Sequence, residues 1–485
     1  MELSQTPPIP NDLRQIMVGL GLAMLLSALD QTVVATAMPT IGKDLGDFDH
    51  LPWIVTAYLV ASTAVTPLYG KLADIHGARV MLLIGIATFV IGSIACALAP
   101  SMKLLALARA VQGLGGGGLI ALAQTIIADL VRPRERGRMQ TYFAIVFVMS
   151  SLGGPVLGGV FAEHLHWSLI FWINLPLGVA AFFMTYAKLA RLPQRRHPHR
   201  LDYAGALVLV LASTSLLLAL SWGGARYPWG SARIVALLAA SITLWSLFAW
   251  RTKTATEPLI PLAVLSNAVV RNATLSGGFG LGTFIALTIF MPIYFEGVLA
   301  LPADESGLAL IPLTVGTVSG ATISGRLMSR VRHYKAMPLA ALAGALAAIA
   351  TLFFRIGDLP LAAIDGFLGA VGFGIGAMLP VSTVSVQNAV SARHLGTATA
   401  VMQFLRQLGG VLVVAIFGAI VIGGGHAGVA HGGGPSPASL SPAGVEALRE
   451  TFRPTFGVAA LCLLLCFLFL ARMEERSLHG ENHIL

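Results

Sequence analysis

The sequence predicts an all-α polytopic membrane protein with fourteen transmembrane helices, and three observations lead to this fold class. Of the 485 residues, 56% are hydrophobic and 11% are charged, whereas soluble domains carry about 25% charged residues. Apolar stretches long enough to span a bilayer, which takes about 20 residues as a helix, recur along the whole chain. The Lys and Arg residues gather in alternate loops, as they do in cytoplasmic loops of membrane proteins.

Each expected helix is a window of mostly apolar residues long enough to cross the hydrocarbon layer. The first helix is too long for the apolar core of a signal peptide, and the start MELSQTPPIPND is acidic rather than basic. We therefore expect an uncleaved anchor there. The expected extents, in order, are 15–38, 52–71, 80–99, 103–130, 139–162, 168–190, 203–222, 232–250, 270–297, 305–328, 337–355, 361–389, 397–423 and 453–472.

The placement of basic residues tests this helix count. With the N-terminus inside, 22 of the 31 Lys and Arg residues fall on the inner side and seven on the outer side. A wrong count would invert the asymmetry from the error onward, and it holds to the end. We therefore expect a multi-pass protein of the cell inner (plasma) membrane with both termini cytoplasmic. The same bias explains the net charge of +9 without a nucleic-acid partner, and contact with anionic lipid adds to it.

The chain carries a weak internal repeat. Gly70 and Leu72, near the end of the second helix, align with Gly325 and Leu327, near the end of the tenth. The fourth helix has AVQGLGGG where the twelfth has AVGFGIGA, and LGGPVLGGV in the fifth matches LGGVLVVAI in the thirteenth. Helices one to six thus resemble helices nine to fourteen in the same orientation.

Parallel repeats of two six-helix halves resemble the plan of the major facilitator fold, with the substrate site between the halves near mid-membrane. The expected organisation has three parts. These are an N-terminal six-helix bundle (1–190), a linker with the inserted seventh and eighth helices (191–252), and a C-terminal six-helix bundle (253–485). The last part includes a Gly/Pro-rich outer loop (424–450) of open role and a cytoplasmic tail.

The loop after the second helix reads GKLADIHGAR, beginning at Gly70 and ending at Arg79. Gly70 lets a neighbouring helix approach closely. Asp74 can face a helix N-terminus, where an anion gains about 0.3–1 kcal/mol, and Arg79 can pair with a carboxylate. With Gly77, these residues form a candidate conformational latch on the cytoplasmic side. The second copy has Ser329 in place of Asp74, so the latch should be one-sided.

Two charged residues lie inside apolar stretches: Asp30 in LSALDQTVVATAMPTIG and Arg109 in LLALARAVQGLGGGG. An ionised Asp at the centre of a membrane costs about 2.5–3.5 kcal/mol, so such residues are usually functional. At 1.5 Å of rise per residue, the depths of Asp30 and Arg109 differ by only about 3 Å. We expect them to form a proton-coupling pair. The alternative is a static ion pair that only fixes helix packing. Gln112 is a candidate substrate or relay residue.

The fifth helix carries Ser150 followed by Gly154, Pro155, Gly158 and Gly159. Small residues at four-residue spacing allow close contact between membrane helices. Pro155 removes a backbone donor and can kink the helix. The pattern therefore predicts a helix that packs tightly against a neighbour and bends.

These motifs resemble the major facilitator superfamily signatures G-x-L-a-D-r-x-G-r-R, R-x-x-Q-G and G-x-x-x-G-P-x-x-G-G, with Ser150 in place of the first Gly of the third. LDQTVVATAMP, WIVTAY, FWINLP and RQLG resemble the family's fourteen-helix drug:proton antiporter branch. Ser168 departs from it, since Arg is frequent there. The resemblance covers nearly the whole chain. It implies a proton-coupled secondary active exporter of lipophilic or cationic amphipathic compounds that works by alternating access.

Three other polar residues have two interpretations each. Glu296 ends the ninth helix and Asp365 opens the twelfth. They either face a vestibule that attracts a cationic drug or reach the outer surface, where long side chains snorkel. Arg406, in the inner half of the thirteenth helix, either binds an anionic substrate or head group or makes a structural pair.

We expect a transporter and no enzyme, because the chain shows no catalytic constellation and no phosphate-binding loop. We expect no metal site, since Cys96, Cys462 and Cys466 lie in predicted helices as packing residues. No cofactor is expected beyond the proton motive force. The expected partners are a small-molecule substrate, protons and the bilayer, acting on a monomer, with a periplasmic adaptor protein left open. The alternatives are a dedicated exporter of one metabolite, lipid or acid and a non-transporting membrane sensor.

Overall fold

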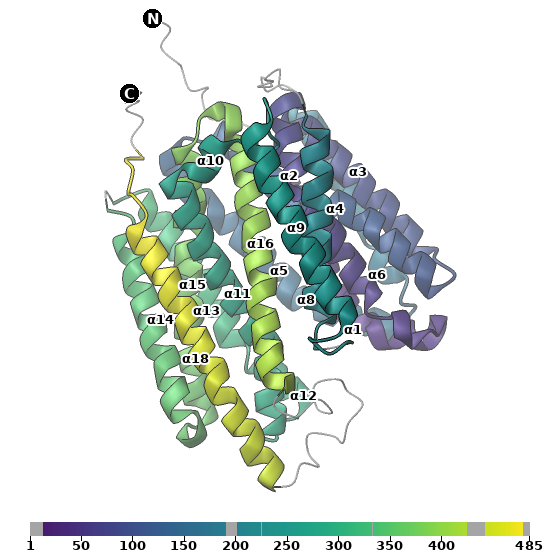
Figure 1. The fold of residues 1–485 in the computed structure, drawn as a ribbon, viewed down its shortest axis with the longest axis vertical. Helices are drawn as coiled ribbons and strands as arrows, with labels where there is room; N and C mark the ends of the chain where they lie inside the picture. The colour runs from purple at the N-terminus through teal and green to yellow at the C-terminus, as the bar shows by residue number, and fades with distance from the viewer. Residues whose placement is uncertain (1–12, 191–200, 225, 332, 424–441, 479–485) are drawn as a thin grey trace, which may run out of the picture.

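The computed structural model describes residues 13–190, 201–224, 226–331, 333–423 and 442–478 (Figure 1). Within these ranges it contains fourteen helical segments that are long and apolar enough to cross a membrane. The prediction of an all-α, multi-pass membrane protein is confirmed. Parts of the predicted linker and of the predicted outer loop, residues 191–200 and 424–441, lie outside the described residues. The rest of the predicted outer loop, 442–450, is not a loop, because the last helix already begins at Pro442.

Six spans form the first half of the chain. The sixth is interrupted at Ile173 and consists of two helices. The bounds are α1 Leu13–Leu45, α2 Trp53–His76, α3 Ala78–Ala97, α4 Met102–Leu130, α5 Pro133–His164, α6 Leu169–Trp172 and α7 Asn174–Leu189. The structure extends α1 past Pro39 and starts α5 at Pro133, beyond the expected limits. A Pro within a helix kinks it without always ending it, and Pro is favoured in the first helical turn.

The middle pair and the second half supply the other eight spans. The bounds are α8 Tyr203–Trp222, α9 Ala232–Thr254, α10 Leu262–Ser266, α11 Ala268–Gly297, α12 Ala303–Leu308, α13 Ile311–Met328, α14 Ala336–Arg355, α15 Leu361–Ala389, α16 Leu395–Gly423 and α18 Pro442–Arg472. Three short 3-10 turns, Phe48–His50, Ile356–Asp358 and Ala392–His394, join helices.

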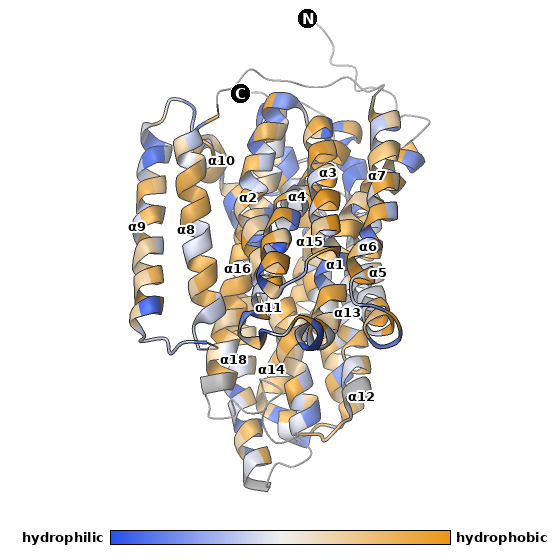
Figure 2. Ribbon diagram, turned by 90° about the vertical axis from the view of Figure 1, so that its right-hand side faces the viewer, coloured by the Kyte–Doolittle hydropathy of each residue, from blue (hydrophilic) through white to orange (hydrophobic). Residues whose placement is uncertain are grey.

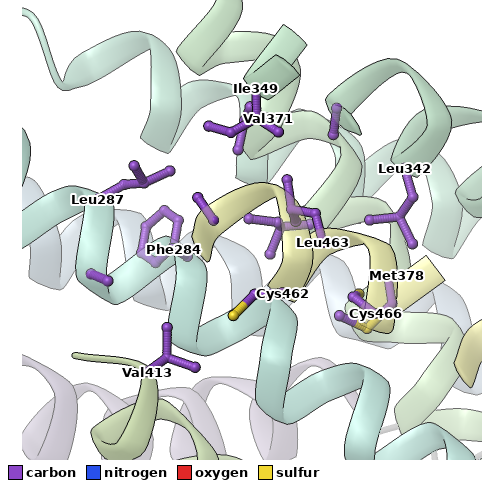
Figure 3. Close-up of a cluster of buried hydrophobic side chains, with 14 of the residues drawn as sticks. Phe284, Leu287, Leu342, Ile349, Val371, Met378, Val413, Cys462, Leu463 and Cys466 are labelled. Atoms are coloured by element: carbon purple, nitrogen blue, oxygen red, sulfur yellow. The ribbon is translucent and has the colours of Figure 1, made fainter. Parts of the chain in front are cut away.

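Each half has its own apolar core. Two clusters of buried side chains lie entirely within residues 16–189, and a third lies within 264–478. Figure 3 shows part of this third cluster, where Cys462 and Cys466 lie among Phe284, Met378 and Leu463. Both cysteines are free and buried. In the described part of the chain, no three His, Cys, Asp or Glu side chains are grouped as a metal site would require.

The inserted pair, α8 and α9, lies at one side of the molecule (Figure 2). Helix α8 of the pair packs against both α2 and α16. A small core joins Leu209 and Phe248 of the pair to Val401, Phe404 and Leu408 of α16. The pair therefore attaches to both halves without entering either core.

The two halves meet through helix pairs related by the internal repeat. Helix α2 packs on α16, and α5 packs on α13. Both contacts depend on glycine. A Cβ atom on Gly70 of α2 would lie 2.4 Å from the Ala400 Cβ of α16, and one on Gly325 would lie 2.3 Å from the Gly137 carbonyl oxygen of α5. Backbones thus touch across the interface at the end of the molecule that carries Asp74.

Close helix packing within the first half yields a stability prediction. A Cβ on Gly115 of α4 would lie 2.3 Å from the Phe89 backbone nitrogen and 2.7 Å from the Gly85 carbonyl oxygen of α3. Gly115→Ala forces these backbones apart and should destabilise the protein by about 1–3 kcal/mol, as overpacking usually does. Thermal unfolding of the detergent-solubilised protein should show a lower Tm.

The matched control is Gly344→Ala, because a Cβ at Gly344 meets no atom within 4 Å. It should leave Tm unchanged or raise it, since Ala favours a helix over Gly. A wild-type Tm for the Gly115 variant would contradict the packing described for α3 and α4.

Candidate functional site

Asp30 of α1 and Arg109 of α4 form an ion pair inside the first half. The Arg109 Nη1 donates to Asp30 Oδ2 at 2.5 Å, and the two side chains are 1% and 0% exposed. The Arg109 Nε also donates to the carbonyl oxygen of Ile54 on α2 at 3.0 Å. Three helices are therefore joined at one buried pair of opposite charges.

Amide and hydroxyl side chains complete this network. Gln112 donates through Nε2 to Asp30 Oδ1 at 2.8 Å and to the Ser93 hydroxyl at 2.9 Å. Its Oε1 accepts from Arg109 at 2.6 Å. Asn174, at the start of α7, donates to Ser93 at 2.9 Å and to Asp30 at 3.4 Å. Asp30 itself accepts from three side chains, those of Arg109, Gln112 and Asn174.

Aromatic rings cover the guanidinium of Arg109. Its Cζ lies 4.4 Å from the ring centroid of Tyr58 and 5.7 Å from that of Phe171. Arginine over an aromatic face gains about 0.5–2 kcal/mol, the larger values applying where water is excluded. The Tyr58 hydroxyl is itself 3.0 Å from the Ser27 hydroxyl. Arg109 is thus held by a carboxylate, an amide, a backbone carbonyl and two rings.

Asp74 joins the two halves at the N-terminus of α16. Its Oδ1 accepts from the Gly396 N–H at 2.8 Å. Its Oδ2 accepts from the Thr397 N–H at 2.9 Å and from the Thr397 hydroxyl at 2.6 Å. The first N–H groups of a helix have no partner within the helix and attract anions. The latch expected from sequence therefore has Asp74 bound across the interface.

The other latch residues have different surroundings. Gly77 joins α2 to α3 with φ 95° and ψ 135°, in the left-handed half of the map that favours glycine. Arg79 donates to the carbonyl oxygen of Tyr186 on α7 at 3.0 Å, and its Cζ lies 5.3 Å from that tyrosine ring. Arg79 therefore binds a backbone carbonyl of the first half and not the carboxylate expected from sequence.

The glycines of α5 pack against α1 directly after Asp30. A Cβ on Gly154 would lie 2.0 Å from the Thr32 hydroxyl, and one on Gly158 would lie 2.0 Å from the Thr36 hydroxyl. The Thr32 hydroxyl also donates to the carbonyl oxygen of Ser150 at 2.8 Å. By contrast, a Cβ on Gly159 would meet no atom within 4 Å, and Pro155 is exposed.

A cavity of about 220 Å³ lies between the two halves. Its walls come from α1, α4 and α5 on one side and from α11, α13, α15 and α16 on the other. The lining is mostly apolar, and its polar members are Gln124, Gln140, Thr317, Thr383, Gln403, Arg406 and Gln407. Ligand pockets usually measure about 300–1,000 Å³, so a drug-sized molecule would need the halves to separate.

The remaining predicted residues are dispersed. Arg406 lines the cavity and donates to the hydroxyls of Ser382 at 2.5 Å and Thr383 at 3.1 Å. Glu296 and Asp365 do not line the cavity and are partly buried. The structure therefore brings Asp30, Arg109 and Gln112 together and leaves these three residues apart from that network.

The chain matches a known protein family over most of its length. The sequence profile of the Major Facilitator Superfamily matches residues 20–414. The chain belongs to the major facilitator superfamily. By its family, it is a multi-pass membrane transporter.

Several relatives of this superfamily member are named for multidrug resistance or transport. Multidrug resistance protein 3 of Bacillus subtilis (strain 168) is 35% identical over 406 residues, covering 84% of this chain and 79% of the relative. Multidrug transporter protein MdtP of the same organism is 33% identical, covering 84% and 75%. Multidrug resistance protein fnx1 of Schizosaccharomyces pombe is 32% identical, covering 83% and 77%.

Solved structures of the superfamily share the fold. The proton:xylose symporter XylE aligns with a TM-score of 0.64 at 14% identity, covering 96% of this chain and 97% of that one. The human organic anion transporter MFSD10 aligns with a TM-score of 0.64 at 17% identity, covering 94% and 100%. At such identities the likeness concerns the fold alone.

Sequence reasoning missed several members of the Asp30 network: Ser93, Asn174, Tyr58 and the Ile54 carbonyl. Asn174 could have been found from sequence, because it belongs to the FWINLP stretch that resembles the family. Ser93 gave none, because a lone Ser in an apolar helix is ordinary. A backbone carbonyl cannot be singled out from sequence at all.

The latch generates a second prediction. Asp74→Asn removes the charge that three donors share, and hydrogen bonds to charged groups contribute about 1.5–3 kcal/mol each. The protein exchanges between an arrangement in which Asp74 joins the two halves and one in which the halves are separated at this end. The equilibrium should shift toward the separated arrangement by about tenfold, or about 1.4 kcal/mol. Spin labels are placed at His76→Cys and Arg393→Cys, both exposed. Double electron–electron resonance should report a larger population of long distances between the two labels in the Asp74 variant.

The control is Asp358→Asn, because Asp358 is exposed and its ion pair with Arg355 is local. This variant should give the wild-type distance distribution. The native cysteines are buried, so labelling is confined to the introduced sites. An unchanged distribution for the Asp74 variant would mean that this carboxylate does not hold the halves together.

Proposed function

We propose that this protein is a proton-coupled exporter, a drug:proton antiporter of lipophilic compounds, in the inner membrane with both termini cytoplasmic. The single observation that carries the proposal is the buried Asp30–Arg109 pair, which holds an ionisable carboxylate within an apolar bundle. Intramembrane carboxylates of this kind mark proton relays. The multidrug names of the relatives support the choice of substrates.

The coupling step is the gain and loss of a proton at Asp30. The carboxylate accepts from Arg109, Gln112 and Asn174, so a proton on it has to displace one of these donors. The Asn174 Oδ1 is buried and has no hydrogen-bond partner. Rotation of that amide would offer an acceptor to protonated Asp30. Neutralising Asp30 also weakens its hold on Arg109, and the network has to rearrange.

A path from Asp30 to the other half runs through α5. Thr32 and Thr36 follow Asp30 on α1 and pack against Gly154 and Gly158 of α5. Helix α5 in turn packs on α13 of the second half. A shift of α1 would therefore displace α5 at the interface between the halves. This is the physical route by which protonation favours one orientation of the two bundles.

The moving units in this proposal are the bundles 1–190 and 253–485, which rock about the central cavity while the pair within 191–252 follows. Protons enter down their gradient, and the membrane potential adds about 2.3 kcal/mol per charge per 100 mV. The proton motive force is the sole energy source, and no cofactor is required. One chain is sufficient for the cycle, and a periplasmic adaptor would act only on released substrate.

The decisive experiment uses everted vesicles that hold a proton gradient. A panel of lipophilic cations and neutral dyes is added to vesicles with wild-type protein and with Asp30→Asn. Several unrelated compounds should dissipate the gradient with the wild type and none with the variant, because the amide carries no proton at neutral pH.

Asp365→Asn is the matched control, since Asp365 lies outside the Asp30 network and the central cavity. It should retain at least half of the wild-type response. Full coupling in the Asp30 variant would make Asp30 structural and overturn the proposal. A wild type that responds to one compound only would favour a dedicated exporter, and one that responds to none would favour a dedicated exporter of a substrate outside the panel or a protein that does not transport.

A further inference from the structure

Arg406 of α16 is a buried cation without a counter-ion. Its side chain belongs to the central cavity, and the residue is 3% exposed. Its two hydrogen-bond partners, Ser382 and Thr383, are neutral hydroxyls of α15. Its Nε has no partner. In the part of the chain that the structure describes, no carboxylate lies within ion-pair distance of it, in contrast to Arg109.

Such an arrangement is energetically unfavourable for a purely structural residue. Removing a charge from water costs several kcal/mol even after the protein relaxes, and a paired opposite charge normally offsets this cost. Two hydroxyls satisfy two of the five N–H donors of a guanidinium and bring no charge. An anion that enters the cavity would supply both the missing charge and the missing acceptors.

The surroundings of Arg406 favour an anion with a large apolar body. Arg406 is the single charged side chain among the described residues that line the cavity. The other walls include Phe143, Phe147 and Phe284, with glutamines at intervals. Gly277 lies opposite the guanidinium, and a Cβ there would be 2.2 Å from the Arg406 Nε. Because Gly277 has no side chain, the guanidinium can pack directly against α11.

We propose that Arg406 is the anion-binding subsite of the central cavity and that the preferred substrates are amphipathic acids, with one carboxylate on a lipophilic body. The inference rests on the proposed function and deepens it by naming the substrate class. The carboxylate binds the guanidinium, the body packs on the apolar walls, and the glutamines donate to or accept from polar groups. Cationic compounds bind more weakly, because they face the charge of Arg406.

The test measures binding of a matched ligand series to purified protein in lipid nanodiscs. Each member of the series is an arylalkyl carboxylate, and its partner is the primary amide of the same body. Isothermal titration at pH 7.5 gives Kd for the wild type, Arg406→Gln and Arg406→Lys. The control variant is Arg271→Gln, since Arg271 is exposed at the start of α11 and outside the cavity.

The wild type should bind carboxylates at least tenfold more tightly than their amides. Arg406→Gln should remove this preference by weakening carboxylate binding alone, and Arg406→Lys should retain part of it because the charge remains. The Arg271 variant should behave as the wild type. Equal affinity of the wild type for acids and amides would overturn the proposal. An equal loss of affinity for carboxylates and amides in Arg406→Gln, at unchanged Tm, would also overturn the proposal, because a structural role predicts that result.

If Arg406→Gln fails to fold, the lysine variant and the wild-type acid-to-amide ratio still decide the question. The result is also separable from the proton coupling. Proton-coupled transport of the amides, tested with Asp30→Asn, would support the antiporter even where the acid preference is absent. An acid preference with no dependence of transport on Asp30 would support the subsite and reject the coupling.

Discussion

The hydrocarbon layer does not tolerate an isolated charge, and the organisation of the first half follows from this constraint. Asp30 and Arg109 neutralise each other at 2.5 Å, and the remaining donors and acceptors around them are largely satisfied by Gln112, Ser93 and the Ile54 carbonyl. One pair thereby ties together α1, α2 and α4, and Ser93 and Asn174 add α3 and α7. In the proposed function, a proton on Asp30 would remove one of the two charges that hold this network together.

Glycine allows the helices next to this network to pack closely. Helix α5 approaches α1 at Gly154 and Gly158, and α13 approaches α5 at Gly325. Asp74 adds a charged contact between α2 and the N-terminus of α16. The halves therefore meet at this end, and the central cavity lies between them. Separating the halves here would break the hydrogen bonds of Asp74 and the close glycine contacts.

Much of this architecture could be predicted from sequence because membrane proteins obey strong one-dimensional rules. Apolar length gave all fourteen spans, and the internal repeat indicated two similar halves. The depth argument placed Asp30 and Arg109 at the same level, but it could not decide whether their faces meet. The ends of α1 and α5 were misjudged since Pro39 and Pro133 have position-dependent effects.

Side-chain partners were harder to predict than helices. Arg79 was expected to bind a carboxylate and instead binds the Tyr186 carbonyl, because backbone acceptors carry no sequence signature. For Arg406 the sequence left two interpretations open, and only the three-dimensional surroundings reveal a cation without a counter-ion. Asn174 lay within a recognisable stretch, yet the sequence did not indicate that its side chain approaches Asp30.

If the gain and loss of a proton at Asp30 drives transport, substrate binding has to change the protonation of Asp30, and proton release from the purified protein tests this most directly. The protein is held in weakly buffered detergent solution at a series of pH values below and above neutral, a saturating lipophilic ligand is added, and the pH change is recorded for wild type and Asp30→Asn. Our account predicts that, at the pH values where Asp30 carries a proton before the ligand is added, ligand binding releases protons from the wild type and none from the variant. Equal proton release from both proteins at every pH, at equal ligand occupancy, would contradict it.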